Sequence, residues 1–514
     1  MNQAEAGLRK NNHAGSPETI VALSTPEGTS GLAVVRLSGL EALTVAREVF
    51  QNDVFAREPE SHHAYYGFIV WPPSFAEVNP VARKTRRPTS PKSEKALTTE
   101  RSGRMLAPGD PVDEVIALPM LSPRSYTGED SVEFFCHGGR VPARLVIEAC
   151  LRAGAVPAGP GEFTRRAFLN GKLSLDQAEA VADLIHAEDE MVAGAAFQQM
   201  RGGFDRELAA IEEPLQDLLA LLEGSLEFGE DEEVEVSRAH QAKAIEGAIA
   251  ELDKLLALAP AGRHLREGVQ VVMVGPPNVG KSALFNTLLG EERVLVDHEP
   301  GTTRDVVTAR TYREGILFVL HDTAGLRPEG GRVEKMGMQR TKQSLEKADI
   351  VVFLQEGGAE NREREFSSTE IDRFWGIGGL EGVESIQVVT KMDLCGPDSP
   401  SSPMAGERNR VETSAKTGAG IELLWQKLLE LAREERLRTA VSMGVVMNAR
   451  HQRKLVQCAT QLSSLRNDLV REHPGEEVVA TLLAGILADL GEVSGRIFTE
   501  SLLDSVFSRF CVGK

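Results

Sequence analysis

The chain has 514 residues, which is more than one hydrophobic core can organise and indicates about three domains. Hydrophobic residues make up 41% and charged residues 26%, as in a globular protein rather than a disordered one. The net charge of −19 argues against a free-standing nucleic-acid binder, because affinity for phosphates requires a basic surface. A nucleic-acid substrate would therefore depend on a local basic patch or on a partner.

The sequence gives no sign of membrane attachment, and we expect a cytoplasmic protein. No apolar run approaches the roughly 20 residues that a membrane-spanning helix needs. Residues 1–18 are polar, lack the apolar segment of a signal peptide, and are expected to form a disordered leader. The five cysteines are scattered and include no C-x-x-C pair, so neither a zinc site nor a disulfide framework is expected.

Residues 19–170 are expected to form an α+β domain. Strands are predicted over 19–38, 112–120 and 132–136, and helices over 40–50 and 141–152. Residues 80–110 interrupt this domain and are rich in Pro, Ser, Lys and Arg, with little apolar periodicity. We interpret them as a flexible basic insertion, which is either a solvated loop or an arm that contacts phosphates.

Two leucine-rich helical segments flank an α/β segment in the rest of the chain. Residues 171–267 and 437–514 carry apolar stripes at three- and four-residue spacing, which is typical of a helix bundle. Pro214 is expected to start or kink one of these helices. Residues 268–436 alternate strands and helices, which predicts a doubly wound α/β domain. We therefore predict one helical domain that is interrupted by an inserted P-loop GTPase-type domain.

The sequence GPPNVGKS at 275–282 fits G-x-x-x-x-G-K-[ST] and stands between an apolar strand and a helix. Gly275 and Gly280 would let backbone N–H groups curl around a phosphate, at the positive end of the helix. Lys281 would reach the β- and γ-phosphates, and the Ser282 hydroxyl would bind Mg²⁺. With the strand and the helix in place, we interpret this segment as a phosphate-binding loop rather than a chance turn. The expected nucleotide contacts here are Asn278, Val279, Gly280, Lys281, Ser282 and Ala283.

Three later motifs choose the nucleotide and sense its γ-phosphate. Asp322 ends a predicted strand, would hold Mg²⁺ through water, and opens a D-T-A-G motif whose last N–H can contact the γ-phosphate. The carboxylate of Asp393 can accept two hydrogen bonds from guanine but not from adenine. After the next strand, a backbone N–H from residues 414–416 can reach the guanine carbonyl. The motifs therefore predict GTP, with Asp322, Thr323, Ala324, Gly325, Thr390, Lys391, Asp393, Ser414, Ala415 and Lys416 as contacts.

A switch loop is expected between the first two motifs, where a threonine hydroxyl should reach Mg²⁺. We favour Thr303 for this role. The expected contacts from the loop are Asp297, His298, Glu299, Pro300, Gly301, Thr302 and Thr303. Leu326 stands where many small GTPases carry a glutamine that orients the attacking water, and leucine cannot do this. Hydrolysis therefore needs another polar group and another positive charge.

The motifs taken together resemble the MnmE (TrmE) family of tRNA-modification GTPases over nearly the whole chain, from Thr19 to Lys514. They are TIVALSTPEG, SYTGEDSVEF with the following HGG, PGEFTRRAFLNGKLSLDQAEA, GPPNVGKS, PGTTRD, DTAGLR and the C-terminal CVGK. The resemblance implies a GTP hydrolase that acts with an FAD-containing partner, MnmG (GidA), which holds most of the tRNA. Such proteins place an aminomethyl or carboxymethylaminomethyl group on carbon 5 of the wobble uridine, with a tetrahydrofolate derivative as one-carbon donor.

The resemblance also implies what replaces the missing glutamine. Family members use K⁺ in the nucleotide site and dimerise their G domains across it, and the ion supplies the charge of an arginine finger. The implied K⁺ ligands are Asn278, Asp297, Glu299 and Thr302, beside the Mg²⁺ ligands Ser282 and Thr303. Glu334 aligns with the glutamate that positions the attacking water, although its residue type alone predicts an exposed helix residue.

The N-terminal domain resembles the folate-binding, dimer-forming domain of the family, which implies a homodimer. The implied folate contacts are Arg36, Glu133, Lys172 and Lys514, which are otherwise ordinary surface or strand-edge charges. Cys511 matches the cysteine needed for modification and follows a helix predicted over 496–510, and a lone thiol near a chain end is otherwise an ordinary free cysteine. The implied catalytic residues are Glu334, Lys281 and Cys511.

Two features depart from the family pattern, and two other functions stay open. Thr390 replaces the usual Asn of N-K-x-D, and because its hydroxyl can still bond the phosphate loop, we expect weaker guanine binding rather than its loss. The insertion at 80–110 is longer than usual and has no assigned role. The chain could instead be a ribosome-assembly or signalling GTPase switch, which needs neither the folate-type domain nor Cys511. A structural dimer with a degenerate site is disfavoured by the intact Lys281, Ser282 and Asp322.

Overall fold

A computed structural model describes residues 18–73, 106–187, 189–228, 236–276, 278–290, 295–296, 307–322, 344–357, 383–394, 409–432, 434–471 and 474–514. These residues form two compact units, one from Met1–Ala182 with Ser494–Lys514 and one from Asp183–Val493. The expected leader and most of the expected basic insertion lie outside the described residues, as 1–17 and 74–105. In the described ranges, no helix is long and apolar enough to cross a membrane.

The first unit is built on a seven-stranded sheet in the order β3-β4-β5-β6-β2-β1-β7. Its strands are β1 (Ile20–Leu23), β2 (Leu32–Ser38), β3 (Phe50–Gln51), β4 (Tyr65–Val70), β5 (Pro111–Met120), β6 (Ser131–His137) and β7 (Val156–Pro157). Neighbouring strands are antiparallel except β1 and β7, which are parallel. The helices α1 (Ala42–Val49) and α4 (Arg140–Arg152) share one buried core with alternate residues of these strands, so they cover one face of the sheet. The predicted α+β domain is therefore confirmed.

The end of the chain packs on this same unit. Its last helix, α18 (Glu500–Phe507), shares a buried cluster with α5 (Glu162–Leu169) and the start of α6 (Leu175–His186). Residues 494–514 therefore separate from the rest of the predicted helical segment 437–514. The helix predicted over 496–510 is wrong at both ends, because α18 begins at Glu500 and ends at Phe507. Thr499 caps its start by accepting a hydrogen bond from the Leu502 N–H at 3.3 Å.

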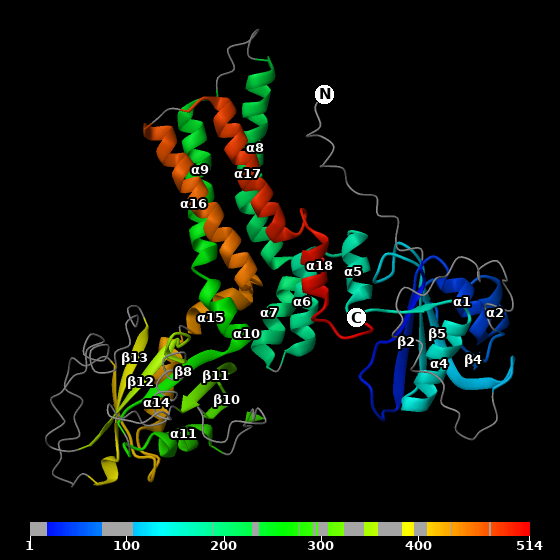
Figure 1. Ribbon diagram of the computed structural model, residues 1–514, viewed down its shortest axis with the longest axis horizontal. Coiled ribbons are helices and arrows are strands. Elements are labelled where there is room, and N and C mark those ends of the chain that lie inside the picture. Colours follow the sequence, from blue (N-terminus) through cyan, green and yellow to red (C-terminus); the bar gives the residue numbers. More distant parts are fainter. Residues whose placement is uncertain are drawn as a thin grey trace, which may run out of the picture. The chain divides into compact units, whose positions relative to one another are not determined.

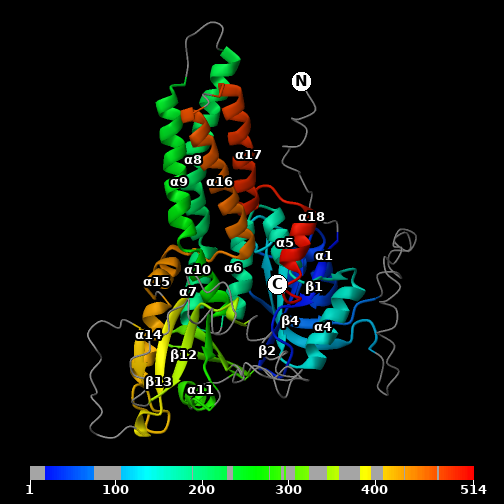
Figure 2. The ribbon, with the colours of Figure 1, turned by 60° about the vertical axis from the view of Figure 1, so that its left-hand side comes forward.

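The four long helices of the second unit lie side by side in both views (Figures 1 and 2). They are α8 (Gly203–Phe228), α9 (Arg238–Leu256), α16 (Ala449–Arg471) and α17 (Glu476–Ser494). Leu208 and Leu252, which precede the nucleotide-binding segment, share one buried cluster with Leu462 and Leu483, which follow it. This cluster confirms that one helical bundle is interrupted by an insertion. The sequence left open whether Pro214 starts or kinks its helix. The residue lies inside α8 and not at its start.

The inserted segment forms a seven-stranded sheet in the order β14-β13-β12-β8-β11-β10-β9. Its strands are β8 (Val269–Val274), β9 (Leu295–Val296), β10 (Val307–Arg313), β11 (Ile316–Asp322), β12 (Ile350–Glu356), β13 (Glu384–Thr390) and β14 (Arg410–Glu412). The five strands from β14 to β11 are parallel, and β10 and β9 add an antiparallel edge. Val271 and Met273 enter one core and Val272 and Val274 another, so both faces of β8 are buried, as in a doubly wound fold.

The remaining helices of the second unit are short. They are α7 (Glu190–Met200), α10 (Ala259–Glu267), α11 (Lys281–Leu289), α14 (Ile421–Leu431), α15 (Glu434–Met443) and the 3-10 turn η3 (Met392–Leu394). The helix predicted over 421–434 ends at Leu431, and α15 begins at Glu434. The helix predicted over 332–347 lies mostly outside the described residues, which begin again at 344.

Candidate nucleotide and folate-type sites

The phosphate-binding loop joins the carboxyl end of β8 to the first turn of α11. Gly280 caps α11 with φ 104°, and Asn278 has φ 62°, so the loop makes two left-handed turns before the helix. A Cβ on Gly275 would lie 2.8 Å from the Leu354 carbonyl oxygen, so the strand end packs too closely for a side chain. Successive N–H groups in such a loop form a concave anion site at the positive helix end. The geometry is therefore that of a phosphate cradle.

Lys281 folds its ammonium over this loop. Its Nζ donates to the carbonyl oxygens of Gly275 and Pro276, each at 2.9 Å, and the side chain is buried. Burial lowers the pKa of Lys281, and the nearby Asp322 carboxylate opposes this shift. A phosphate beside the ammonium would favour its charged form, because an opposite charge in a poorly hydrated site is a strong partner.

Ser282 and Asp322 form the polar pair expected next to Mg²⁺. The Ser282 hydroxyl donates to Oδ2 of Asp322 at 2.7 Å, and Asp322 closes β11, the strand beside β8. Burial raises the pKa of Asp322, while Ser282 and Lys281 oppose the rise. The other oxygen, Oδ1, is buried and has no hydrogen-bond partner in the described parts of the chain. A buried carboxylate oxygen with a free lone pair fits a hydrated cation such as Mg²⁺.

The guanine end is assembled from the ends of β13 and β14. Asp393 lies in η3, and its Oδ1 accepts from the buried Ser414 hydroxyl at 2.7 Å. The Lys391 ammonium pairs with Glu356 at 3.0 Å. The Ala415 carbonyl accepts from the Thr287 hydroxyl of α11 at 3.4 Å, and Lys416 follows it as an exposed residue. The structure therefore brings residues 390–393 and 414–416 to the edge of the sheet that carries the phosphate loop.

Thr390 makes the contact with the phosphate loop that its hydroxyl allowed. Its Oγ1 lies 2.5 Å from the Val279 carbonyl and 3.2 Å from the Gln355 carbonyl, and the side chain is buried. A hydroxyl has a single proton, so it shares that proton between two acceptors. The contact to Gln355, at the end of β12, was not foreseen, because no sequence motif marks that carbonyl.

Several predicted nucleotide contacts lie outside the described residues. They are Asp297, His298, Glu299, Pro300, Gly301, Thr302, Thr303, Thr323, Ala324, Gly325 and Glu334. The switch loop, most of the K⁺ ligands and the glutamate that positions water therefore stay predictions. Among the predicted K⁺ ligands, Asn278 is described, and its exposed side chain stands at the left-handed turn of the phosphate loop.

The N-terminal unit holds a second polar site around Arg36 and Glu133. The two residues face each other on β2 and β6, and Nε and Nη2 of Arg36 lie 2.8 and 2.7 Å from Oε1 of Glu133. The guanidinium carbon also lies 5.5 Å from the ring centroids of both Tyr126 and Phe163. Both charged side chains are mostly buried, at 16% and 14% exposure, so the pair is fixed in place.

Tyr126 and Phe163 were not singled out as site residues from the sequence. Both stand inside conspicuous segments, SYTGED and PGEFT, so the signal was present, but nothing local showed that the two segments meet at Arg36. The Tyr126 hydroxyl is bonded to Thr164 at 2.9 Å, and burial raises the pKa of Tyr126. The aromatic rings are therefore held as firmly as the ion pair.

The C-terminal tail is fastened beside this site. The Phe163 N–H donates to the Lys514 carbonyl at 3.2 Å, the Ser24 hydroxyl donates to the Gly513 carbonyl at 3.1 Å, and Val512 bridges to Pro160. Cys511 is exposed, and its carbonyl accepts from the Gly161 N–H at 3.4 Å. The structure therefore brings the backbone of Lys514 to Phe163, the residue whose ring lies against Arg36, and the backbone of Cys511 to Gly161, two positions earlier.

Lys172 reaches a neighbouring loop. Its Nζ donates to the Pro123 carbonyl at 3.0 Å, on the turn that also carries Tyr126. Three of the four predicted folate contacts are thus linked through Phe163, and the fourth through the turn of Tyr126.

Comparison with known proteins identifies the family of the chain. Residues 19–172 match the family described as GTP-binding protein TrmE N-terminus, and residues 175–511 match the MnmE helical domain. The chain is 37% identical over 512 residues to the tRNA modification GTPase MnmE of Symbiobacterium thermophilum. This match covers 97% of this chain and 99% of that protein. It is 33% identical to the protein of the same name from Aquifex aeolicus, over 97% of this chain and 100% of that protein.

A solved structure is matched over a smaller part of the chain. Era from Aquifex aeolicus is 28% identical over 31% of this chain and 56% of its own, with a TM-score of 0.25. The two relatives from Symbiobacterium thermophilum and Aquifex aeolicus cover almost the full chain, and the family models match its N-terminal and helical segments. The chain therefore belongs to the MnmE (TrmE) family, and it is a GTP hydrolase that functions in tRNA modification.

Proposed function

We propose that this chain couples GTP hydrolysis to modification of the tRNA wobble uridine, together with a flavin-dependent MnmG-type partner and a tetrahydrofolate one-carbon donor. One observation carries the proposal: backbone hydrogen bonds fasten the Cys511–Lys514 tail beside the Arg36–Glu133 pair. The tail carries an exposed thiol, which is a reactive group, and the Arg36–Glu133 pair with its two aromatic rings offers a place for a flat, polar ring.

The N-terminal residues fit the chemistry of a folate ring. Both contacts of Arg36 end on Oε1 of Glu133, so Oε2 of Glu133 is able to accept from N–H groups of a pterin. The rings of Tyr126 and Phe163 offer apolar faces to its flat body. Lys172 and Lys514 are the predicted partners for the carboxylates of the folate tail.

At the nucleotide site, the chain would hold two cations against the phosphates. Ser282 and Thr303 are the predicted Mg²⁺ ligands, and the unpaired Oδ1 of Asp322 supports a hydrated ion beside them. Asn278 is the described member of the predicted K⁺ set, with Asp297, Glu299 and Thr302. Bound K⁺ would supply positive charge near the leaving phosphate. This chain needs such help because Leu326 stands in place of the glutamine that orients water in many small GTPases.

The K⁺ assignment is tested by turnover in KCl and in NaCl at matched ionic strength. We expect GTP hydrolysis to be about 10-fold faster or more in KCl, because a fixed charge at the transition state commonly contributes at least this much. Asn278→Ala should remove most of the difference, whereas Asn286→Ala, a change of the same type at an exposed position of α11, should keep it. Equal rates in the two salts would contradict the assignment.

A homodimer is proposed through the uncovered face of the N-terminal sheet. Tyr66, Ile116, Phe135 and Val34 face one another across β4, β5, β6 and β2, and Tyr66 and Ile116 are 59% and 45% exposed. The row lies on the same face as Arg36, two residues from Val34, so it adjoins the folate-type site. A chain with Tyr66→Glu and Ile116→Glu should have half the light-scattering mass of the unchanged chain, and an unchanged dimer would exclude this face.

The whole proposal is tested by Cys511→Ser, assayed with the partner present. GTP hydrolysis should stay within about 2-fold, because residues 275–416 carry the nucleotide contacts. Wobble-uridine modification should fail, since a serine hydroxyl is a far weaker nucleophile and acid at neutral pH. Ser508→Ala, an exposed change near the same end, is the control and should keep both activities. Normal modification by the Cys511→Ser chain would instead favour a nucleotide switch.

A further inference from the structure

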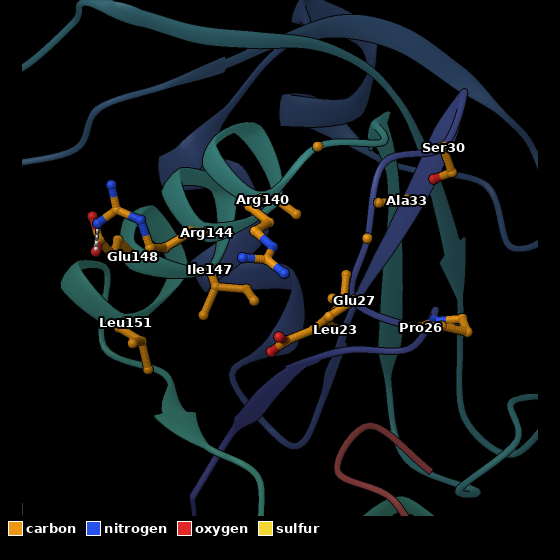
Figure 3. Close-up of a pocket in the computed structure, with 13 residues that line it drawn as sticks. Leu23, Pro26, Glu27, Ser30, Ala33, Arg140, Arg144, Ile147, Glu148 and Leu151 are labelled. Carbon is orange, nitrogen blue, oxygen red and sulfur yellow. Dashed lines mark hydrogen bonds and ion pairs between the residues drawn. The ribbon is translucent and has the colours of Figure 1, made fainter.

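A cavity of about 410 Å³ lies in the N-terminal unit between α4 and the loop that joins β1 to β2 (Figure 3). Its floor is apolar and consists of Leu23, Ala33, Ala143, Ile147 and Leu151. Cavities of this size with mostly apolar walls and a few polar groups are typical of small-molecule sites. The cavity therefore has room for a ligand with one ring or a short chain.

The cavity is separate from the folate-type site. Ala33 belongs to the core that α1 and α4 share, whereas side chains alternate along β2, so Arg36 lies on the opposite face of the sheet. Leu23, Ile147 and Leu151 pack against the same α4-side core. A ligand of this cavity and a ligand of the Arg36–Glu133 site would thus occupy different faces of the sheet.

Two opposite charges converge over the cavity. Figure 3 shows the Arg140 guanidinium and the Glu27 carboxylate extending from opposite sides into the space beside Ile147. Arg144 and Glu148 form an ion pair of 2.7 Å at the rim, so they neutralise each other. Arg140 is exposed, and within the described part of the chain its guanidinium makes no hydrogen bond or ion pair. Arg140 is also the first residue of α4, whose N-cap Gly139 provides no side-chain cap.

These groups choose the chemistry of the ligand. A free guanidinium binds a carboxylate through two parallel hydrogen bonds, and the uncapped start of α4 adds positive potential at the same end. A phosphate dianion is less suitable, because the carboxylate of Glu27 also lines the cavity and would repel the second charge. Glu27 could accept a hydrogen bond from an N–H or O–H group of the ligand.

We propose that this cavity binds a small organic carboxylate, with an apolar ring or chain on the floor and the carboxylate group at Arg140. The site goes beyond the GTP and folate-type sites and does not depend on either. Its ligand would be a second small molecule that the N-terminal unit recognises.

Isothermal titration calorimetry of the full chain with 4-phenylbutyrate tests the proposal, with the neutral 4-phenylbutanamide as the matched probe. A dissociation constant on the order of 0.1–1 mM is expected for the acid, given a ligand of about 12 non-hydrogen atoms. The amide should bind about 10-fold more weakly, because it loses the charged contact with Arg140.

Three variants locate the binding. Ile147→Trp fills the floor and should abolish binding of both probes, while Arg140→Gln should weaken binding of the acid about 10-fold and leave the amide nearly unchanged. Arg57→Gln removes an exposed arginine elsewhere in the same unit and should change neither affinity. GTP turnover and the melting temperature of each variant show whether the chain stays folded.

Several results would overturn the proposal. These are no saturable heat with the acid up to about 10 mM, equal affinity for acid and amide, or binding that survives Ile147→Trp in a folded chain. A lower light-scattering mass for Ile147→Trp would show that a second copy of the chain covers this surface, which also contradicts a ligand site.

Discussion

The nucleotide site and the folate-type site solve the same problem, the fixing of charged groups, in different ways. At the nucleotide site the functional side chains stand a few positions after a strand end, since β8 ends at Val274 before Lys281 and β13 ends at Thr390 before Asp393. At the folate-type site the partners are far apart in sequence, since 97 positions separate Arg36 from Glu133 and 489 separate Ser24 from Gly513. The first site is encoded by short motifs, and the second exists only when the whole unit has folded.

The two sites also differ in how their charges are balanced. Burial lowers the pKa of Lys281 and raises that of Asp322, so the empty protein environment disfavours both charged forms. Phosphates beside Lys281 and a cation beside Asp322 would reverse these tendencies. Arg36 and Glu133 instead neutralise each other. We infer that the nucleotide site gains charge balance from its ligands, whereas the charges of the folate-type site are already paired.

The largest expected effect would separate chemistry from binding at the nucleotide site. Glu334→Ala should slow GTP hydrolysis by about 100-fold or more, because a group that orients the attacking water acts mainly in the transition state. Nucleotide affinity, measured by titration with a fluorescent GTP analogue, should stay within about 2-fold. Glu346→Ala, an exposed carboxylate a little further along the chain, should leave both quantities unchanged. Unaltered turnover in the Glu334→Ala chain would show that Glu334 does not position the attacking water.

A smaller effect is expected from a change that disturbs the folate-type site alone. Gly513 has φ 97°, and a Cβ there would lie 1.9 Å from the Leu23 carbonyl, so Gly513→Ala should release the tail that carries Cys511. We expect wobble-uridine modification to fall by about 10-fold, by the misplacement of a reactive group, with unchanged GTP hydrolysis. Gly475→Ala is the control, because a Cβ at that position meets no atom within 4 Å. A loss of GTP hydrolysis in the Gly513→Ala chain would contradict the independence of the two sites.

The smallest effect concerns the bond by which Thr390 ties the phosphate loop. Thr390→Val keeps the shape but leaves the Val279 and Gln355 carbonyls without the hydroxyl, at a cost of about 1–2 kcal/mol in a buried bond. The dissociation constant for GTP should rise about 5- to 20-fold in a binding titration, if the loop must be held to cradle the phosphates. Thr390→Ser retains a hydroxyl and should restore most of the affinity. If valine binds GTP as well as threonine does, the tether has no part in binding.

Much of the nucleotide site could be predicted from the sequence. Gly280, Lys281 and Ser282 sit in a spacing that only a strand, loop and helix can use, and the periodicities of β8 and α11 are visible on either side. The hydroxyl of Thr390 could also be assigned to the loop, because the motif fixes its distance from the strand end. Local spacing suffices here because parallel strands end at one edge of the sheet.

Only the tertiary structure decided which residues that are distant in the sequence lie together. No local pattern predicts that Phe163 and Tyr126 flank Arg36, that α18 leaves the helical segment to pack against α5, or that the cavity beside α4 opens on the face opposite Arg36. The length of the last helix was predicted wrongly for the same reason, since the tail from Cys511 to Lys514 is held by bonds to Pro160, Gly161 and Phe163 and not by its own helix. Burial and long-range hydrogen bonds set these features, and their energies depend on surfaces that meet only in the folded chain.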